Sequence, residues 1–292
     1  MTVTNVPTQD QLAFAEKQWP LAYGRSLTLG PSAHIMGVLN VTPDSFSDGG
    51  DHLSPDHAVA RAQQMMALGA VIIDIGGEST KPGAEPVSGE MERRRILPVI
   101  DNLARSGDAL ISVDTYRAKT AEAAIDAGAH IVNDVWGCQR EPDIAIVAAQ
   151  TGAGLVIMNT RRERDVLPDL IEDAIAFLTR SIEIAVRAGI REEQIVLDPG
   201  FGFATTIEHD IPLLHGLERL VDFGFPVLIG TSRKRFLGAI TGREPDERGA
   251  ATAATSVIAR QKGASLFRVH DIDMNKDALA VADAVIQARP RA

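Results

Sequence analysis

Cysteine is almost absent from this chain, and its scarcity excludes several classes of protein. The 292 residues contain one cysteine, Cys138. One thiol cannot form an intramolecular disulfide, and a thiolate metal cluster needs several, so a disulfide-bonded scaffold and a zinc ribbon are both excluded. No histidine adjoins Cys138 in the sequence, and we interpret it as a small packing residue rather than a nucleophile. Such cysteine usage fits a reducing compartment, and we expect a cytoplasmic protein.

Long hydrophobic runs and an excess of basic residues are also missing. No apolar run reaches the roughly 18 residues that a membrane-spanning helix needs, and the N-terminus lacks the basic start and apolar centre of a secretory signal. The chain has 29 basic and 39 acidic residues, which give a formal net charge of −10. This sign argues against nucleic acid or a membrane as a partner, and an anionic small ligand would need locally gathered cations.

Several catalytic signatures are absent as well. The sequence has no GxGxxG fingerprint, no GxSxG elbow and no GxxxxGK[ST] loop, which argues against a dinucleotide enzyme, a serine hydrolase and a P-loop nucleotidase. Seven histidines are present, but no HExxH spacing supports a dedicated zinc site. We interpret most of these histidines as surface or helix-face residues, among them His57, His130, His209 and His215.

What is present is a regular alternation of short apolar runs and amphipathic segments. The predicted strands are 35–39, 71–75, 110–113, 130–132, 155–158, 195–197, 226–229 and 265–267. The predicted helices are 55–68, 88–105, 117–127, 142–151, 168–188, 207–221, 247–262 and 275–287. This strict alternation predicts an α/β fold, a single (β/α)8 TIM barrel over residues 34–292. Residues 1–33 form a short N-terminal extension in which we expect at most one short helix.

Polar residues follow each predicted strand. Any one of them could simply start a turn or cap a helix. In a barrel, however, the carboxyl ends of all strands open onto one face, so residues far apart in the sequence converge there. Polar strand ends in register therefore predict a pocket. In strand order they are Asn40, Gly76 with Glu78, Asp114, Asn133, Asn159, Asp198, Ser232 with Lys234, and Arg268 with His270.

One group within this set suits a flat heterocycle. Asp114, Asn133 and Asp198 offer two carboxylates and an amide, which pair with the amine and amide edges of a ring rich in donors. Lys234 can contact a ring carbonyl or nitrogen in the same place. The sequence therefore predicts a pocket for a small nitrogen heterocycle.

A second group suits a phosphorylated ligand. Asn40, Arg268 and His270 supply an amide oxygen, a cation and an imidazole, which can hold such a group together with Mg²⁺. Asn40 also begins a long polar loop, because the strand at 35–39 leads into residues rich in turn formers, NVTPDSFSDGG.

Seven segments of the chain follow one another in the order IMGVLNVTPDSFSDGG, VIIDIGGESTKPGA, ISVDT, IVNDVWG, VLDPGFGF, IGTSRKRFLG and FRVHD. In this order they resemble dihydropteroate synthase of the folate pathway, and the resemblance covers about residue 35 to the C-terminus. It implies a TIM barrel that usually dimerises, and a transferase that uses Mg²⁺ to condense 6-hydroxymethyl-7,8-dihydropterin pyrophosphate with p-aminobenzoate. The products would be 7,8-dihydropteroate and pyrophosphate.

Carried over position by position, the resemblance implies a role for each candidate residue. The residues that match the pterin pocket are Asp114, Asn133, Asp198 and Lys234. Those that match the pyrophosphate site are Asn40, which also matches a magnesium ligand, Arg268 and His270. Those at the p-aminobenzoate site are Phe46, Thr80, Lys81, Pro82, Phe203 and Ser232. The implied catalytic residues are Asp48 on a mobile first loop, Asp114 and Lys234. The family mechanism is a dissociative substitution, in which pyrophosphate leaves before the arylamine attacks.

Some positions depart from the family pattern. Lys81 stands where the second loop commonly has arginine, and Thr205 follows Ala204 where a lysine is usual. Asn159 stands in place of the histidine of a Met-His pair. The arginine-rich segment at 161–164 is interpreted as a solvated loop, because runs of charge usually lie on the surface. None of these changes removes a group assigned to the chemistry.

Two other functions fit part of this pattern. A non-catalytic pterin-binding paralogue would be expected to lose loop or anion-anchoring residues, yet Asn40, Asp48, Arg268 and His270 are all present. A pterin-dependent methyltransferase module would need a corrinoid partner domain, for which the chain has no room. Both remain alternatives to a competent synthase.

Overall fold

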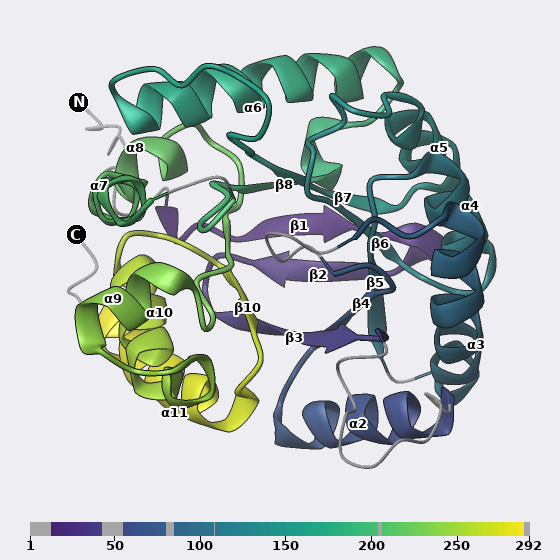
Figure 1. The fold of residues 1–292 in the computed structure, drawn as a ribbon, viewed down its shortest axis with the longest axis horizontal. Helices are drawn as coiled ribbons and strands as arrows, with labels where there is room; N and C mark the ends of the chain where they lie inside the picture. Colours follow the sequence, from purple (N-terminus) through teal and green to yellow (C-terminus); the bar gives the residue numbers. More distant parts are fainter. Residues whose placement is uncertain (1–12, 43–54, 80–84, 108, 204–205, 289–292) are drawn as a thin grey trace, which may run out of the picture.

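Eight parallel strands form the centre of the molecule, and the helices surround them (Figure 1). The computed structural model describes residues 13–42, 55–79, 85–107, 109–203 and 206–288. The strands lie in the order β8-β7-β6-β5-β4-β3-β10-β9, and a parallel bridge between Leu197 and Val227 joins the two ends of the sheet. The predicted (β/α)8 barrel is therefore confirmed. The strand bounds are β3 (His34–Asn40), β4 (Ile72–Gly76), β5 (Leu110–Asp114), β6 (Ile131–Asp134), β7 (Gly154–Met158), β8 (Ile195–Asp198), β9 (Leu228–Ile229) and β10 (Leu266–Val269).

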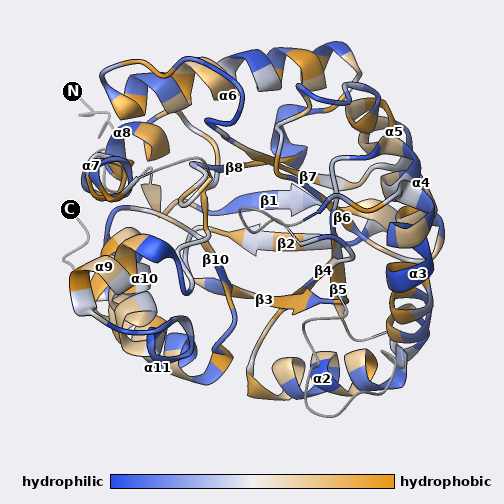
Figure 2. Ribbon diagram, in the orientation of Figure 1, coloured by the Kyte–Doolittle hydropathy of each residue, from blue (hydrophilic) through white to orange (hydrophobic). Residues whose placement is uncertain are grey.

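The helices are amphipathic and cover the outside of the barrel, with hydrophilic and hydrophobic residues interspersed along each (Figure 2). Side chains cap several of them: Ser88 accepts from Met91 N at 3.2 Å at the start of α3, and Asp169 accepts from Ile171 N at 2.9 Å at the start of α6. No helix among the described residues is long and apolar enough to cross a bilayer. The bounds are α2 (Pro55–Leu68), α3 (Gly89–Ser106), α4 (Ala118–Asp126), α5 (Asp143–Thr151), α6 (Leu170–Arg187), α7 (Ile207–His215), α8 (Leu217–Val221), α9 (Arg235–Thr241), α10 (Gly249–Gln261) and α11 (Ile272–Gln287).

Two helical predictions needed correction. The single helix predicted over residues 207–221 is two helices, because Gly216 leaves the helical conformation between α7 and α8. A side chain at that position would meet Ile171 Cγ1 at 2.7 Å, so the close approach of α6 requires glycine there. Helix α9 was not predicted. Its buried Phe236 and Leu237 lie too close together in a seven-residue segment to show a helical period.

The described part of the N-terminal extension is an antiparallel hairpin rather than a helical segment. Strands β1 (Lys17–Pro20) and β2 (Ser26–Leu29) are joined through the 3-10 helix η1 (Ala22–Gly24). The hairpin buries Trp19 and Leu29, which pack against the N-terminal ends of the barrel strands. The indole Nε1 of Trp19 donates to the carbonyl of Gln194 at 2.8 Å, so its one polar atom is satisfied. The hairpin thereby covers the N-terminal end of the barrel.

The barrel interior changes from apolar to polar along the strands. The layer next to the hairpin consists of Met36, Ile72, Leu110, Ile131, Val156, Val196, Leu228 and Leu266. Two residues further along β4 and β5, the buried interior residues are Asp74 and Ser112. At the carboxyl ends, the strands present the polar residues that the sequence analysis singled out. The apolar layer of the barrel interior thus lies at one end and the candidate site at the other, while the larger hydrophobic core is formed by residues of the strands and the surrounding helices.

Candidate functional site

Four of the predicted residues share one level of the barrel. The strand register aligns Asn40 with Gly76, Gly76 with Asp114, and Asp114 with Asn133. A Cβ atom on Gly76 would lie 3.7 Å from Asn40 Oδ1 and 3.5 Å from Asp114 Cβ. The glycine therefore leaves open space between the side chains of Asn40 and Asp114, which are 74 positions apart in the sequence. The predicted convergence of these strand ends is confirmed.

Arg268 on β10 is the central cation of the pocket. Its Nε lies 2.6 Å from Asp74 Oδ2, and its second guanidinium nitrogen lies 2.7 Å from Asp114 Oδ2. Asn133 Nδ2 donates to the same Asp74 oxygen at 3.1 Å. The sequence analysis placed Arg268 in an anion site, and the structure shows its guanidinium held by two carboxylates beside the predicted heterocycle pocket.

Asp74 is a residue of this site that sequence reasoning missed. It lies inside the apolar run IIDIG, was treated as part of a buried strand, and is completely buried. A carboxylate within an otherwise apolar strand is itself the signal that could have found it, since a buried charge requires a partner.

Burial shifts the pKa values of the carboxyl groups in the pocket. Burial raises the pKa of Asp114 to about 7, although the charge on Arg268 opposes the shift and the neighbouring Asp74 adds to it. Burial likewise raises the pKa of Asp198 to about 6, against the hydrogen bond from Gly200 N and the charge on Lys234. Both carboxyl groups therefore titrate near the neutral range rather than near pH 4.

Lys234 faces Asp198 and an aromatic ring. Burial lowers the pKa of Lys234 to about 8, while the charge on Asp198 acts in the opposite direction. Its Nζ lies 4.2 Å from the ring centre of Phe203, a cation–π distance. A Cβ on Gly202 would come within 2.7 Å of Lys234 Cδ, so this glycine makes room for the lysine chain. The result is an ammonium donor fixed between a carboxylate and an aromatic face.

Ser232 and His270 form a second polar pair on the same face. The Ser232 hydroxyl lies 2.9 Å from His270 Nδ1 and accepts from the His270 backbone N–H at 3.2 Å. The sequence analysis gave these two residues to different ligands, the serine to the arylamine and the histidine to pyrophosphate. The structure places them in direct contact, so the two predicted subsites adjoin.

The arginine-rich segment after β7 is a buried network, and its interpretation as a solvated loop was wrong. The side chain of Arg161 is fully buried and its Nε lies 3.1 Å from Asp173 Oδ2. Arg164 makes two bonds of 2.7 Å to the same carboxylate and one of 3.0 Å to Asn159 Oδ1. Asn159 also donates to the Pro199 carbonyl at 3.1 Å, so this strand end ties two loops together rather than pointing into the pocket.

Other strand-end residues are also structural. Glu78 forms an ion pair with Arg117, with 2.7 Å between Glu78 Oε2 and Arg117 Nη1. Asp134 accepts from the backbone N–H groups of Trp136 at 2.8 Å and Cys138 at 2.6 Å, which holds the turn after β6. Burial raises the pKa of the Cys138 thiol well above its ordinary value, consistent with a packing role. His130 was expected on the surface, but it is buried and its Nδ1 accepts from Ile111 N at 3.1 Å.

Several predicted residues lie outside the described part of the chain. Phe46 and Asp48 belong to the first loop, and Thr80, Lys81 and Pro82 belong to the second. The departures at Ala204 and Thr205 also lie outside it. The structure therefore locates the pterin and anion candidates, and the arylamine candidates only at Phe203 and Ser232.

A cluster of three or more acidic, histidine or cysteine side chains that could enclose a metal does not occur among the described residues. The donor groups present instead suit a metal ion that is coordinated mainly by the bound substrate. Asn40 supplies one amide oxygen beside the open space at Gly76, and Mg²⁺ commonly takes one or two protein oxygens together with phosphate oxygens and water. These residues fit Mg²⁺ carried by a pyrophosphate group.

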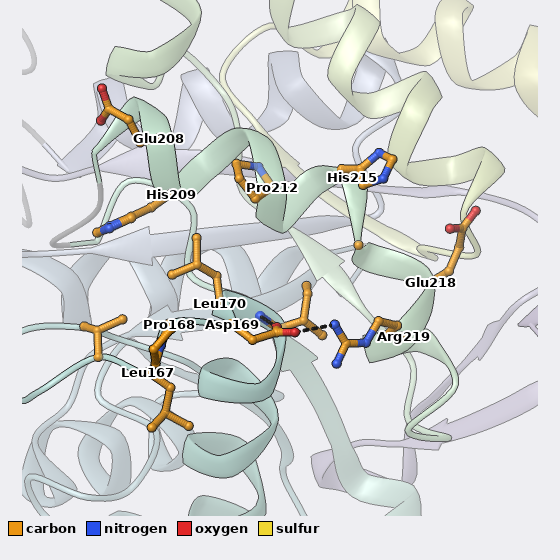
Figure 3. A pocket seen from close by; sticks show the side chains of 13 residues that line it. Leu167, Pro168, Asp169, Leu170, Glu208, His209, Pro212, His215, Glu218 and Arg219 are labelled. Carbon is orange, nitrogen blue, oxygen red and sulfur yellow. Dashed lines mark hydrogen bonds and ion pairs between the residues drawn. The ribbon is translucent and has the colours of Figure 1, made fainter.

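A separate hollow of about 860 Å³ lies on the outside of the barrel, between the start of α6 and helices α7 and α8. Asp169 and Arg219 point toward one another across it (Figure 3), with their charged atoms 2.9 Å apart. Its lining includes none of the residues predicted for the site. The predicted site residues that the structure describes lie instead on the barrel face that holds Arg268 and Lys234.

Comparisons with known proteins identify the family of this chain. Residues 36–270 match a family described as pterin binding enzyme. The chain is 46% identical over 255 residues to dihydropteroate synthase from Bacillus subtilis, covering 86% of this chain and 88% of that protein. A structure of the Xanthomonas albilineans synthase with 4-aminobenzoic acid matches with a TM-score of 0.88 and 41% identity, over 94% of this chain and 100% of that one. Another, in complex with 7,8-dihydropteroate, matches with a TM-score of 0.84 and 40% identity, over 93% and 100%. The chain belongs to the dihydropteroate synthase family of pterin-binding enzymes.

Proposed function

We propose that this protein condenses 6-hydroxymethyl-7,8-dihydropterin pyrophosphate with p-aminobenzoate, forming 7,8-dihydropteroate and pyrophosphate. The observation that carries the proposal is the convergence of Asp114, Asn133, Asp198, Lys234 and Arg268 at one end of the barrel. Relatives of the same fold and family have been crystallised with 4-aminobenzoic acid and with 7,8-dihydropteroate, which supports these substrate classes.

The pterin ring is read by acceptors and one cationic donor. Asp114 and Asp198 accept from the ring amine and amide N–H groups, and Asn133 offers its carbonyl oxygen, since its amide nitrogen is committed to Asp74. Lys234 remains largely protonated at neutral pH and donates to a ring carbonyl or nitrogen. The two carboxyl groups are shielded from water in the pocket. Hydrogen bonds from the pterin ring therefore take the place of hydrogen bonds that water would otherwise donate to them.

The pyrophosphate group is held on the side of β3, β9 and β10. His270 and Ser232 already contact one another there, and Arg268 lies at the boundary with the pterin pocket. Asn40 would hold Mg²⁺ together with the pyrophosphate oxygens, and the ion would neutralise the charge that builds up on the leaving group. In a protein of net charge −10, these local cations are what makes the site attractive to a polyanion.

The reaction is a dissociative substitution. The bond between the pterin methylene carbon and oxygen breaks, and its electron pair leaves with pyrophosphate. The amine of p-aminobenzoate donates its lone pair to the resulting carbocation and then loses a proton. Phe203 provides an aromatic surface for the arylamine beside Lys234. Asp48, on the first loop, stabilises the cation, and loop closure excludes water that would compete as a nucleophile.

The alternatives make different demands on the same residues. A paralogue that only binds pterin has no need of Asn40 or of the Ser232–His270 pair, yet all three are present and the pair is in contact. A methyltransferase module has no need of an arylamine surface at Phe203. Retention of both groups favours the synthase.

The test separates binding from turnover. Asp48→Ala is expected to bind pterin as wild type does and to lose most of its turnover, because the loop carboxylate acts only on the developing cation. Asp44→Ala, in the same loop, is the matched control and should keep turnover near the wild-type value. Isothermal titration with the pterin and a product assay measure the two quantities. Equal turnover in Asp48→Ala and wild type would remove Asp48 from the mechanism.

We also propose that the protein is a cytoplasmic homodimer. Helices α10 and α11 carry exposed apolar side chains, with Ile258 42%, Val281 67% and Val285 54% exposed, and a symmetric partner would cover them. Sedimentation of the wild type against Val281→Glu tests the dimer, which the charge should dissociate. The cytoplasmic location rests on the cysteine usage, and fractionation of expressing cells tests it.

A further inference from the structure

We propose that Asp74 is a positioning residue for catalysis, whose carboxylate holds Arg268 and Asn133 in the orientations in which they meet the pterin pyrophosphate. The inference rests on the proposed function and assigns a role to a residue of β4 that faces the barrel interior. Asp74 acts through its two neighbours rather than on the reacting atoms.

One oxygen atom of Asp74 serves both neighbours. Asp74 is completely buried, and its Oδ2 lies 2.6 Å from Arg268 Nε and 3.1 Å from Asn133 Nδ2. The three residues come from β4, β10 and β6, so the carboxylate joins strands that are not neighbours in the sheet. A single buried atom thus fixes one cation and one amide of the pocket.

This arrangement determines the hydrogen-bonding direction of Asn133. Because its Nδ2 donates to Asp74, its Oδ1 is left as the acceptor for a donor on the ligand. Without the carboxylate, the amide can rotate and present either group. Asp74 therefore fixes Asn133 as a hydrogen-bond acceptor for the N–H groups of the ring.

The arrangement also keeps Arg268 from competing with the ligand. The guanidinium is shared between Asp74 and Asp114, and Asp114 is the residue whose carboxyl group the pterin needs. With Asp74 in place, Arg268 stays anchored when Asp114 turns to the ligand. If Asp74 loses its charge, Asp114 becomes the only carboxylate bonded to the guanidinium, and ligand binding must break that pair.

Stability alone gives little reason for a charge at this position. The neighbouring residues of β4 are the fully buried Ile72, Ile73 and Ile75. Replacing a buried ion pair by apolar residues of similar volume is often neutral or stabilising, so a packed interior does not require Asp74. Its place between two functional side chains is explained by what those side chains do.

Asp74→Asn tests the proposal, and Ser112→Ala is the matched control. Ser112 lies beside Asp74 in the strand register, is equally buried, and its hydroxyl has no hydrogen-bond partner among the described residues. For Asp74→Asn we expect KM for the pterin pyrophosphate to rise about 30-fold, because truncating one partner of a buried charge pair has effects of this order. KM for p-aminobenzoate should change less than about threefold, since Asp74 bonds to Arg268 and Asn133 rather than to the two described arylamine candidates, Phe203 and Ser232. Ser112→Ala should leave both values near wild type.

A merely structural role gives a different result. It would lower the melting temperature of Asp74→Asn and leave its KM for pterin pyrophosphate within about twofold of wild type, which would overturn the proposal. An equal rise in both KM values would overturn it as well. If the wild type shows no turnover, the proposed function fails, and titration of the same variants with 7,8-dihydropteroate still measures whether Asp74 supports pterin binding.

A second comparison applies if Asp74→Asn does not fold. The double variant Asp74→Asn with Arg268→Gln is compared with Arg268→Gln alone. Arg268→Gln leaves both Asp74 and Asp114 without their guanidinium partner, whereas the double variant leaves only Asp114 so. Because the competing guanidinium is gone, only the contact with Asn133 remains to be lost. We therefore expect the second substitution to raise KM for the pterin pyrophosphate less than about threefold, well below the effect of about 30-fold expected with Arg268 present. A further rise of about 30-fold would show that Asp74 acts independently of Arg268 and would contradict the account.

Discussion

The two ends of the barrel differ in what their buried side chains do. At the N-terminal end, the hairpin side chains Trp19 and Leu29 pack against a continuous apolar layer. At the C-terminal end, Asp74 and Asp198 are buried, and Asp114, Arg268 and Lys234 are partly buried beside them. The interior of the barrel is therefore apolar at one end and charged at the other.

Because of this difference, the N-terminal end of the barrel contributes mainly to stability and the C-terminal end mainly to the proposed function. Apolar burial at the N-terminal end favours folding in proportion to the area removed from water. Burial at the C-terminal end raises the pKa values of Asp114 and Asp198 and lowers that of Lys234, so the charges on these three side chains are disfavoured by their surroundings. Substitutions at the two ends should consequently have opposite profiles in stability and activity.

The largest effect on stability is expected at the hairpin. Trp19→Ala removes an indole that is 1% exposed and packs against the apolar layer, so the free energy of unfolding should fall by about 3–5 kcal/mol. In the remaining folded protein, kcat/KM should match wild type, since the substitution lies at the opposite end from the site. Leu27→Ala, on the partly buried face of the same hairpin, should have a smaller effect. Chemical denaturation and a product assay measure both. A loss of kcat/KM in folded Trp19→Ala would contradict the separation of stability at the N-terminal end from function at the C-terminal end.

The opposite profile is expected for Asp198→Asn. The folded-state pKa of Asp198 is raised to about 6, so the native carboxyl group binds a proton more readily than the unfolded one. Its stabilising contribution is lost as pH rises through 6, and above that value the buried charge costs up to about 3 kcal/mol. Asparagine removes this cost and keeps an oxygen for Gly200 N.

Unfolding measured at pH 8 should therefore show Asp198→Asn to be more stable than wild type, with weaker pterin binding. Between pH 4 and 6, the advantage should shrink as the wild-type carboxyl group becomes protonated. If Asp198→Asn were less stable than wild type both at pH 8 and between pH 4 and 6, the carboxylate would support the fold.

A smaller, pH-dependent effect is expected at His130, next to the apolar end. Burial lowers the pKa of His130 to about 4, so the unfolded chain takes up a proton there between pH 6.5 and 4 while the native protein does not. Its stabilising contribution is present at neutral pH and is lost as pH falls through this window, by up to about 3 kcal/mol. His130→Asn should flatten the stability curve over this range. Identical curves for the two proteins would contradict the assignment of a neutral, buried imidazole.

The sequence was sufficient for the parts of the structure that repeat a simple pattern. Alternating apolar runs and helices define a barrel, and polar residues such as Asp114 and Asn133 that follow apolar runs were correctly expected to meet at its carboxyl end. The hairpin was not predicted, since its strands have four residues each and include Pro20. Strands this short show no clear alternation.

The sequence failed where burial depends on a distant partner. Asp74 is accommodated by Arg268, 194 positions away, and Arg161 by Asp173, which lies in the first turn of α6 after the intervening loop. In each case the local pattern favours another interpretation, an apolar strand for the first and a solvated run of charge for the second. Only the fold brings the compensating charge into contact.

The central claim is that the charged end of the barrel catalyses transfer of a pterin methylene group to an arylamine. Its most direct test mixes the purified protein with Mg²⁺, 6-hydroxymethyl-7,8-dihydropterin pyrophosphate and p-aminobenzoate and follows pyrophosphate release. The account predicts release that requires p-aminobenzoate and falls to background in Asp114→Ala, which has lost one of the two carboxylates that hold Arg268. Release no faster than in Asp114→Ala would contradict it.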